Sequence, residues 1–187
     1  FLPFSFKNGF QFTGFRGLAS HGAAIGIITA MYFYSKKVLQ KPILWILDRI
    51  VIAVASGAVF VRIGNFINSE IIGKATNSDF GVVFKQLGED FPRHPAQLYE
   101  SFCYVFVFFI LHYLYWKTNK SKQLGYLLGT FLVLLWTVRF FVEFVKEAQV
   151  DERSEWILNT GQWLSVPFII IGFYLMISSS KRPLKDA

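Results

Sequence analysis

Five long apolar stretches constrain what this chain can fold into more than any other feature. They cover approximately residues 17–34, 44–66, 98–116, 124–145 and 163–178. A helix needs about 20 mostly apolar residues to cross a bilayer, and the tryptophans near several stretch ends are typical of the membrane interface. We therefore predict an all-α, polytopic integral membrane protein with about five transmembrane helices, forming a single membrane domain over residues 1–187.

The composition supports the membrane class. Of the 187 residues, 53% are hydrophobic and only 17% are charged, whereas a soluble domain usually carries about a quarter charged residues. The net charge of +7 does not indicate a nucleic-acid partner, because the charges lie in short clusters between the apolar stretches. The single cysteine, Cys103, excludes an intrachain disulfide and is interpreted as a small buried residue.

The charges between the stretches predict the orientation of the chain in the membrane. Nine cations and one acid, Asp186, follow the first, third and fifth stretches; the cations are Lys36, Lys37, Lys41, Lys117, Lys120, Lys122, Lys181, Arg182 and Lys185. The connections 69–97 and 146–155 hold more acids than bases. Because cytoplasmic loops are rich in lysine and arginine, we predict a cytoplasmic C-terminus and place these two connections on the outer face. Asp48 and Arg49 are interpreted as an orientation pair.

An unusual polar segment closes the second apolar stretch: Arg62-Ile63-Gly64-Asn65-Phe66-Ile67-Asn68-Ser69-Glu70. Ionisable residues so close to the bilayer usually line a cavity or a substrate path. Arg62 and Asn65 are three residues apart and share a helix face, and a guanidinium among amides suits a phosphate. A snorkelling interfacial arginine is the alternative, although such an arginine needs none of these polar neighbours.

A second pair of charged residues lies near the outer end of the fourth stretch. Arg139 and Glu143 are four residues apart and share a face. They fit a buried structural ion pair as well as a ligand site. Two arginines on two helices facing one outer cavity favour an anionic ligand.

His21 stands at the outer start of the first stretch. It fits either a hydrogen-bonded interfacial histidine or a base whose pKa lies near working pH. The chain has no Walker loop, zinc-type ligand spacing, nucleophile elbow or dinucleotide fingerprint. If the protein is a catalyst, we expect cations and a base to do the chemistry, with no metal and no cofactor.

Several motifs together resemble the prolipoprotein diacylglyceryl transferase family of the bacterial inner membrane. Besides the segment at Arg62, they are Ser20-His21-Gly22-Ala23-Ala24-Ile25-Gly26, Arg93-His94-Pro95-Ala96-Gln97-Leu98-Tyr99-Glu100, Arg139-Phe140-Phe141-Val142-Glu143-Phe144 and Gly161-Gln162-Trp163-Leu164-Ser165. The resemblance covers nearly the whole chain. It implies transfer of a diacylglyceryl group from phosphatidylglycerol to the lipobox cysteine thiol of a prolipoprotein, with release of glycerol phosphate.

The resemblance also implies roles for individual residues. Arg62 would bind the lipid phosphate, and Arg139 would steady the phosphate as it leaves. The head-group pocket would be shaped by Asn65, Glu70 and Gly73. Glu143 would orient Arg139, and His21 would take the thiol proton.

The chain also departs from the family pattern. The family has about seven spans, so we expect two spans, with a tyrosine of the site, upstream of Phe1. Leu135 stands where the family often has tyrosine, and Lys146 where it often has arginine. Two alternatives remain open at this point: a non-catalytic membrane transporter that binds an anion or lipid, and an inactive fragment.

Overall fold

The structure is a computed structural model that describes residues 4–5, 11–12, 20–147 and 159–184. Side chains are described for residues 25–147, 159 and 161–184. The chain divides into two compact units, residues 1–46 and residues 47–187. That residues 1–187 form a single membrane domain stays a prediction.

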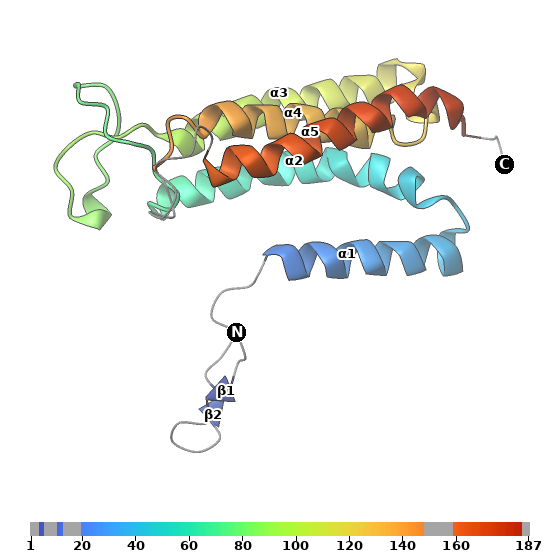
Figure 1. Cartoon of the computed structure of the whole chain (residues 1–187), viewed down its shortest axis with the longest axis horizontal. Helices are drawn as coiled ribbons and strands as arrows, with labels where there is room; N and C mark the ends of the chain where they lie inside the picture. Colours follow the sequence, from blue (N-terminus) through green and yellow to red (C-terminus); the bar gives the residue numbers. More distant parts are fainter. Residues whose placement is uncertain (1–3, 6–10, 13–19, 148–158, 185–187) are drawn as a thin grey trace. The chain divides into compact units, whose positions relative to one another are not determined.

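The first unit contains one longer helix and a small hairpin (Figure 1). Strands β1 (Phe4–Ser5) and β2 (Gln11–Phe12) pair antiparallel, and they add two short strands to the predicted all-helical pattern. Helix α1 (Ser20–Tyr34) matches the first apolar stretch, and the π-helical turn η1 (Ser35–Leu39) follows it. This turn ends at Gln40, which adopts a left-handed conformation with φ 52°, a common way to stop a helix.

The second unit contains most of α2 (Ile43–Ile67) and three further helices that run alongside it (Figure 1). These are α3 (Ala96–Lys117), α4 (Tyr126–Val142) and α5 (Thr160–Ser178), and α4 contacts both α3 and α5. Their bounds lie within a few residues of the predicted stretches. Three single turns complete the unit: η2 (Lys85–Leu87), η3 (Asn119–Lys122) and η5 (Ser179–Lys181).

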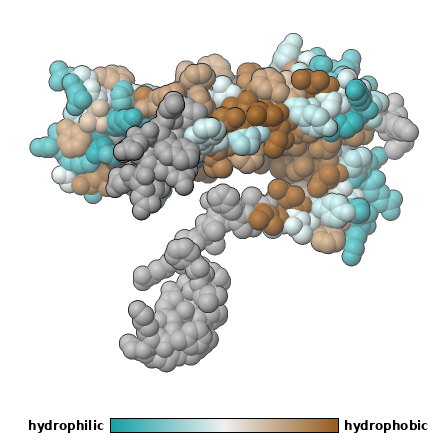
Figure 2. Space-filling view, in the orientation of Figure 1, coloured by the Kyte–Doolittle hydropathy of each residue, from teal (hydrophilic) through white to brown (hydrophobic). Residues whose placement is uncertain are grey.

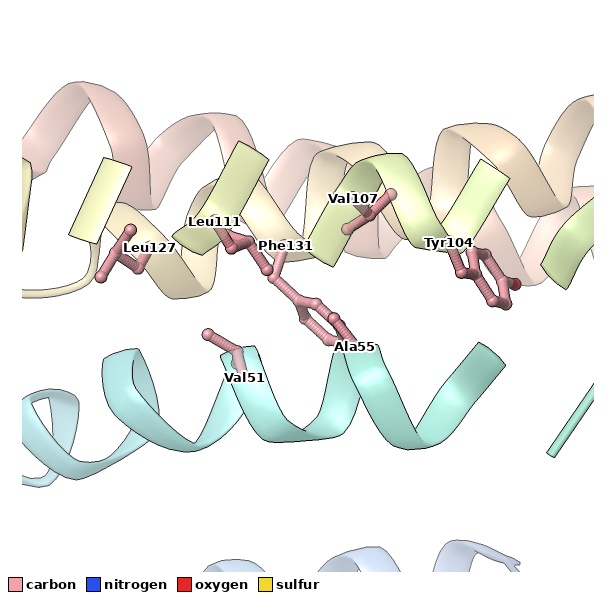
Figure 3. Close-up of a cluster of buried hydrophobic side chains, with 7 residues drawn as sticks. All are labelled: Val51, Ala55, Tyr104, Val107, Leu111, Leu127 and Phe131. Atoms are coloured by element: carbon pink, nitrogen blue, oxygen red, sulfur yellow. The ribbon is translucent and has the colours of Figure 1, made fainter. Parts of the chain in front are cut away.

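A cluster of buried apolar side chains holds α2, α3 and α4 together (Figure 3). Its members are Val51, Ala55, Tyr104, Val107, Leu111, Leu127 and Phe131. Val51 and Ala55 come from α2, and the other members come from α3 and α4. The cluster lies between the two polar ends of these helices.

Helices α4 and α5 approach each other closely through two facing glycines. A Cβ atom on Gly129 would lie 2.6 Å from the Gly172 carbonyl oxygen, and one on Gly172 would lie 2.8 Å from the Gly129 carbonyl oxygen. Small residues of this kind allow close helix packing in membranes. The rings of Trp136 and Phe168 stack across the same interface, with centroids 4.3 Å apart.

Asp48 has a different role from the predicted orientation pair with Arg49. Its carboxylate is only 1% exposed, and it accepts hydrogen bonds from the backbone N–H groups of Gly125 (2.6 Å) and Leu128 (2.8 Å). Gly125 is the N-cap residue of α4 and Leu128 lies in its first turn, where backbone N–H groups have no intrahelical acceptor. Asp48 therefore caps a helix that is distant in sequence, and that contact cannot be inferred from the neighbouring Arg49.

The outer surface of the second unit is that of a membrane protein. On the face shown in Figure 2, apolar residues gather over the middle of the helices and hydrophilic residues over both ends. Large apolar side chains such as Phe60, Phe106 and Phe173 are exposed, as lipid contact allows.

Three helical segments of the described residues are long and apolar enough to cross a bilayer: α2, α3 and Gly161–Lys181. Helix α4 is shorter, with 17 residues, and α1 has 15. The prediction of an all-α, polytopic membrane protein is confirmed. That all five helices span the membrane stays a prediction.

Candidate anion-binding site

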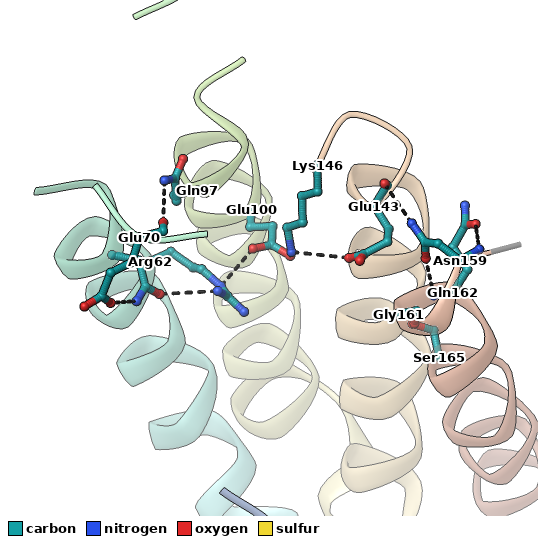
Figure 4. Close-up of polar contacts among 11 residues, drawn as sticks. Arg62, Glu70, Gln97, Glu100, Glu143, Lys146, Asn159, Gly161, Gln162 and Ser165 are labelled. Carbon is teal, nitrogen blue, oxygen red and sulfur yellow. Dashed lines mark hydrogen bonds and ion pairs between the residues drawn. The ribbon is translucent and has the colours of Figure 1, made fainter. Parts of the chain in front are cut away.

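Polar side chains gather at the end of the second unit where α2 ends, α3 begins, α4 ends and α5 begins (Figure 4). The charge pattern predicts that this end lies at the outer face of the membrane. It brings together the segments around Arg62, Glu100, Glu143 and Gln162. Residues widely separated in the sequence therefore form one polar cluster beyond the apolar core.

Arg62 is held on two sides and is only 12% exposed at its side chain. Its Nε lies 2.8 Å from Oε2 of Glu100, and its Nη1 donates to Oδ1 of Asn65 at 3.3 Å. Asn65 in turn donates to Oε2 of Glu70 at 2.8 Å. Arg62 and Asn65 share a face of α2, as their spacing predicts, and the guanidinium is fixed rather than free to snorkel.

Glu100 is the acidic centre of the cluster. Its side chain is fully buried, with one oxygen near Arg62 and the other accepting from Nζ of Lys146 at 2.7 Å. Lys146 is itself only 4% exposed. From the sequence, Lys146 is expected among the charges of an outer loop, and no role is expected for Glu100. An acid inside an apolar stretch needs a buried partner, which is the feature that could have singled out Glu100.

Glu143 also contacts Lys146, with Oε2 at 3.5 Å from Nζ. Its backbone carbonyl accepts from Nδ2 of Asn159 at 3.2 Å, and Asn159 caps α5 in a capping box with Gln162. A Cβ atom on Gly161 would overlap the Glu143 carboxylate. Glu143 thus joins α4 to α5 and, among the described residues, its ion pair is with Lys146 and not with the expected Arg139.

Arg139 lies beside an aromatic ring and has donor capacity left over. Its Cζ is 5.4 Å from the ring centroid of Trp136, a cation–π distance. Its Nε is buried and finds no hydrogen-bond partner among the described side chains and backbone. A buried guanidinium N–H without an acceptor is costly, so an acceptor brought by a ligand would be stabilised here.

One pocket connects the two arginines. It has a volume of about 420 Å³ and is lined by Arg62 from α2, Tyr104 from α3, and Trp136 and Arg139 from α4. The rest of its lining, which includes Leu135, is small or aliphatic. The prediction that two arginines on two helices face one cavity is confirmed by this geometry.

Glu70 and Gly73 lie in the connection between α2 and α3. The backbone carbonyl of Glu70 accepts from Nε2 of the buried Gln97 at 2.6 Å. Gly73 is buried, and its N–H donates to the His94 carbonyl at 3.1 Å. A Cβ atom on Gly73 would overlap that carbonyl and lie 2.9 Å from the Val145 carbonyl oxygen. Gly73 therefore allows three chain segments to meet beside Lys146.

Arg93 anchors the same connection. It is 8% exposed, its Nη1 donates to the Gly73 carbonyl at 3.2 Å, and Nη1 also lies 2.9 Å from Oε2 of Glu147. Two further hydrogen bonds join its guanidinium to the Glu89 carboxylate. These hydrogen bonds lower the pKa of Glu89 below its ordinary value, because they favour the ionised carboxylate.

The structure does not test His21 as a base. His21 lies in the first turn of α1, but its side chain is outside the described residues. It also belongs to the first compact unit, so its proximity to Arg62 stays a prediction. Among the side chains that the structure describes, no group of three or more His, Cys, Asp or Glu could hold a metal ion. A site that works without a metal likewise stays a prediction.

The fold and the site define a class: a multi-pass α-helical membrane protein with two arginines lining one pocket. Comparison with known proteins then identifies the family. The family model described as prolipoprotein diacylglyceryl transferase matches residues 4–178. The chain belongs to the prolipoprotein diacylglyceryl transferase family.

Individual relatives agree with this assignment. The chain is 43% identical over 182 residues to a phosphatidylglycerol–prolipoprotein diacylglyceryl transferase of Bacteroides fragilis, covering 97% of this chain and 64% of the relative. Proteins of the same name from Tolumonas auensis and Chloroherpeton thalassium are 44% and 45% identical over 166 residues, which cover 89% of this chain and 64% and 62% of those relatives. The chain thus spans somewhat less than two thirds of the length of these curated relatives.

Proposed function

We propose that this protein transfers the diacylglyceryl group of phosphatidylglycerol to the cysteine thiol of the lipobox in a prolipoprotein, and releases glycerol phosphate. The observation that carries the proposal is the pocket shared by Arg62 and Arg139, in which the Arg139 Nε has no partner among the described residues. Family membership and the names of the relatives supply the reaction and its two substrates.

The reaction makes one bond and breaks one. The cysteine sulfur, as thiolate, attacks the glycerol carbon of the diacylglyceryl group that carries the phosphate ester. A C–S bond forms while the C–O bond to phosphate breaks, and the ester oxygen leaves with the bonding electron pair as part of glycerol phosphate. The thiol proton passes to a base, for which His21 is the candidate.

The two arginines match the charge that develops in this reaction. Negative charge grows on the departing phosphate, and fixed cations in a water-poor site stabilise it most effectively. Arg62 is held at Nε and Nη1 by Glu100 and Asn65, so it binds the phosphate without reorganising. Arg139 offers its unpartnered Nε to the same anion.

We place the protein in the bacterial inner membrane with its site toward the outer face and its C-terminus in the cytoplasm. The distribution of lysine and arginine between the apolar stretches supports this orientation. In that orientation Arg62 and Arg139 lie on the side of the pocket that is nearer the outer leaflet. The apolar surface of the helices would face the acyl chains.

A membrane assay with the full-length protein, phosphatidylglycerol and a lipobox peptide tests the proposal. We expect a thioether product, and we expect Arg62→Ala to lower its rate about 100-fold to 1,000-fold, the usual effect of removing one donor to a developing anion. Arg49→Ala, an arginine at the other end of α2, is the matched control and should keep the rate. If wild-type protein made no thioether, or if Arg62→Ala made it as fast, the proposal would be wrong.

A further inference from the structure

The described charges at the site do not cancel. Three buried or partly buried cations, Arg62, Arg139 and Lys146, stand with two such carboxylates, Glu100 and Glu143. Arg93 and Glu89 form a further pair that cancels within itself. One positive charge is therefore left over. Glu70 and Lys74 at the rim are exposed and opposite in sign, so water screens them and they contribute little to this balance.

Glu100 links the surplus charge to the geometry of Arg62. One of its oxygens lies 2.8 Å from Arg62 Nε and the other 2.7 Å from Lys146 Nζ, and the carboxylate is fully buried. A buried carboxylate that pairs with a single cation neutralises the charge of that cation. The Glu100 carboxylate is instead shared between Arg62 and Lys146. Lys146 thus takes up part of the negative charge that would otherwise fall on Arg62 alone.

The same contacts decide which part of Arg62 can reach a ligand. A guanidinium has five N–H donors. Asn65 accepts one from Nη1, and the Glu100 carboxylate forms an ion pair with the group, its Oε2 lying 2.8 Å from Nε. Tyr104 is also hydrogen-bonded to the Arg62 side chain, and Arg62 and Tyr104 both line the pocket with Arg139. Glu100 therefore acts on the orientation of Arg62 as well as on its charge.

We propose that Glu100 and Lys146 are positioning residues that set the net charge of the site to one positive charge, which matches a singly charged phosphodiester. This proposal rests on the proposed function. The charge of the site also explains how the product leaves. A phosphomonoester such as glycerol phosphate carries close to two negative charges at neutral pH, so the site does not neutralise it fully. The charge balance then favours the substrate over the product.

Four proteins test the pair: full-length wild type, Lys146→Met, Glu100→Gln and the double variant. The net charge of the five counted side chains is +1 in wild type, 0 in Lys146→Met, +2 in Glu100→Gln and +1 in the double variant. Binding of phosphatidylglycerol in phosphatidylcholine nanodiscs should weaken about tenfold in Lys146→Met and return to within about threefold of wild type in the double variant. Lys146→Arg keeps the charge and should bind as wild type does. Lys85→Met, an exposed lysine of the α2–α3 connection, is the matched control.

Glu100→Gln separates charge from orientation. It should bind glycerol phosphate about tenfold more tightly than wild type, because the site gains a positive charge. Its kcat should fall by a larger factor than its KM changes, because Arg62 loses its fixed orientation. A residue that only supported folding would not shift the preference between a singly and a doubly charged ligand.

Rescue decides the proposal. If the double variant binds phosphatidylglycerol as weakly as Lys146→Met, or more weakly, charge balance is not the role of the pair. The thermal midpoint in detergent shows whether Lys146→Met folds. If it does not fold, the test uses Glu100→Gln instead and compares its affinity for glycerol phosphate with its affinity for phosphatidylglycerol. A ratio of these affinities equal to that of wild type would overturn the proposal. Wild-type protein that binds with this pattern but makes no thioether would refute the proposed function alone.

Discussion

The second unit buries charge at both ends, and the two ends differ in whether that charge is satisfied. At one end the Asp48 carboxylate, 1% exposed, accepts two backbone hydrogen bonds from the start of α4. At the other end Arg62 and Lys146 share Glu100, while Arg139 keeps a buried Nε with no partner among the described residues. Both ends are built from α2, α3 and α4, around one apolar cluster.

The difference teaches how to separate a structural charge from a functional one. Burying a charge is costly unless it is paired and hydrogen-bonded. Asp48 meets that condition within the protein, so its role ends with the stability of the helix it caps. The arginine end is not satisfied in this way: Arg139 Nε and one oxygen each of Glu100 and Glu143 are buried without a hydrogen bond among the described residues. We propose that an anion bound there supplies the acceptor that Arg139 lacks. Substitutions at each end test this contrast.

Replacing Arg139 should have the largest effect. We expect Arg139→Ala to lower the rate of thioether formation about 100-fold or more, because a donor to the departing phosphate is lost. Arg139→Lys keeps the charge but loses the planar fork, and should recover only part of that rate. Rates are measured in the lipobox-peptide assay at saturating phosphatidylglycerol. Full activity of Arg139→Ala would remove Arg139 from the site.

Replacing Asp48 should affect stability and not binding. Asp48→Ala leaves the first N–H groups of α4 without their acceptor and should cost about 1–2 kcal/mol, as for the loss of a helix cap. A lower thermal midpoint in detergent, with unchanged phosphatidylglycerol affinity of the folded protein, is the expected result. Asp79→Ala removes an exposed carboxylate and should leave both quantities unchanged. A loss of affinity in Asp48→Ala would break the contrast between the two ends.

A smaller effect is expected at Gly161, where the added methyl group would push against the Glu143 carboxylate. Gly161→Ala should displace Glu143 from Lys146 and lower the transfer rate about threefold to tenfold, or roughly 0.7–1.4 kcal/mol. Gly64→Ala is the matched control, because a Cβ atom on Gly64 meets nothing within 4 Å. Equal rates in the two variants would show that the contact of Glu143 with Lys146 does not matter for transfer.

The smallest effect concerns the partly exposed Glu89. Arg93 lowers the pKa of Glu89 in the folded state, so the pair contributes stability above the ordinary glutamate pKa of about 4.3. That contribution is lost as the pH falls through the lowered folded-state pKa. Glu89→Gln should therefore be slightly less stable than wild type at pH 7, and the difference should vanish in strong acid. Thermal midpoints across pH measure it, and a difference that grows in acid would have the wrong sign.

Much of the fold could be predicted from the sequence, because apolar stretches of spanning length leave a chain few choices. All five stretches became helices within a few residues of their expected bounds. The convergence of Arg62 and Arg139 followed from the alternation of loop charges, which put both residues at the same end.

The partners of the charged residues could not be predicted in the same way. Helix spacing suggested that Glu143 pairs with Arg139, but the chain turns after α4 and brings Lys146 back to Glu143 and Glu100. Asp48 accepts a hydrogen bond from Gly125, which lies 77 residues further along the chain, because the start of α4 packs beside it. Spacing along one helix says which residues share a face, and it does not say which other helix meets that face.

The most direct test of the central claim, that Arg62 and Arg139 bind one anion together, is a double-mutant cycle on the Kd for phosphatidylglycerol. The cycle compares wild type, Arg62→Ala, Arg139→Ala and the double variant in nanodiscs. If both side chains contact the same phosphate, each single variant should weaken binding about tenfold or more. The double variant should then lose clearly less than the product of the two factors, because residues that share a partner are coupled. Two losses that simply multiply, or affinities equal to wild type, would contradict the account.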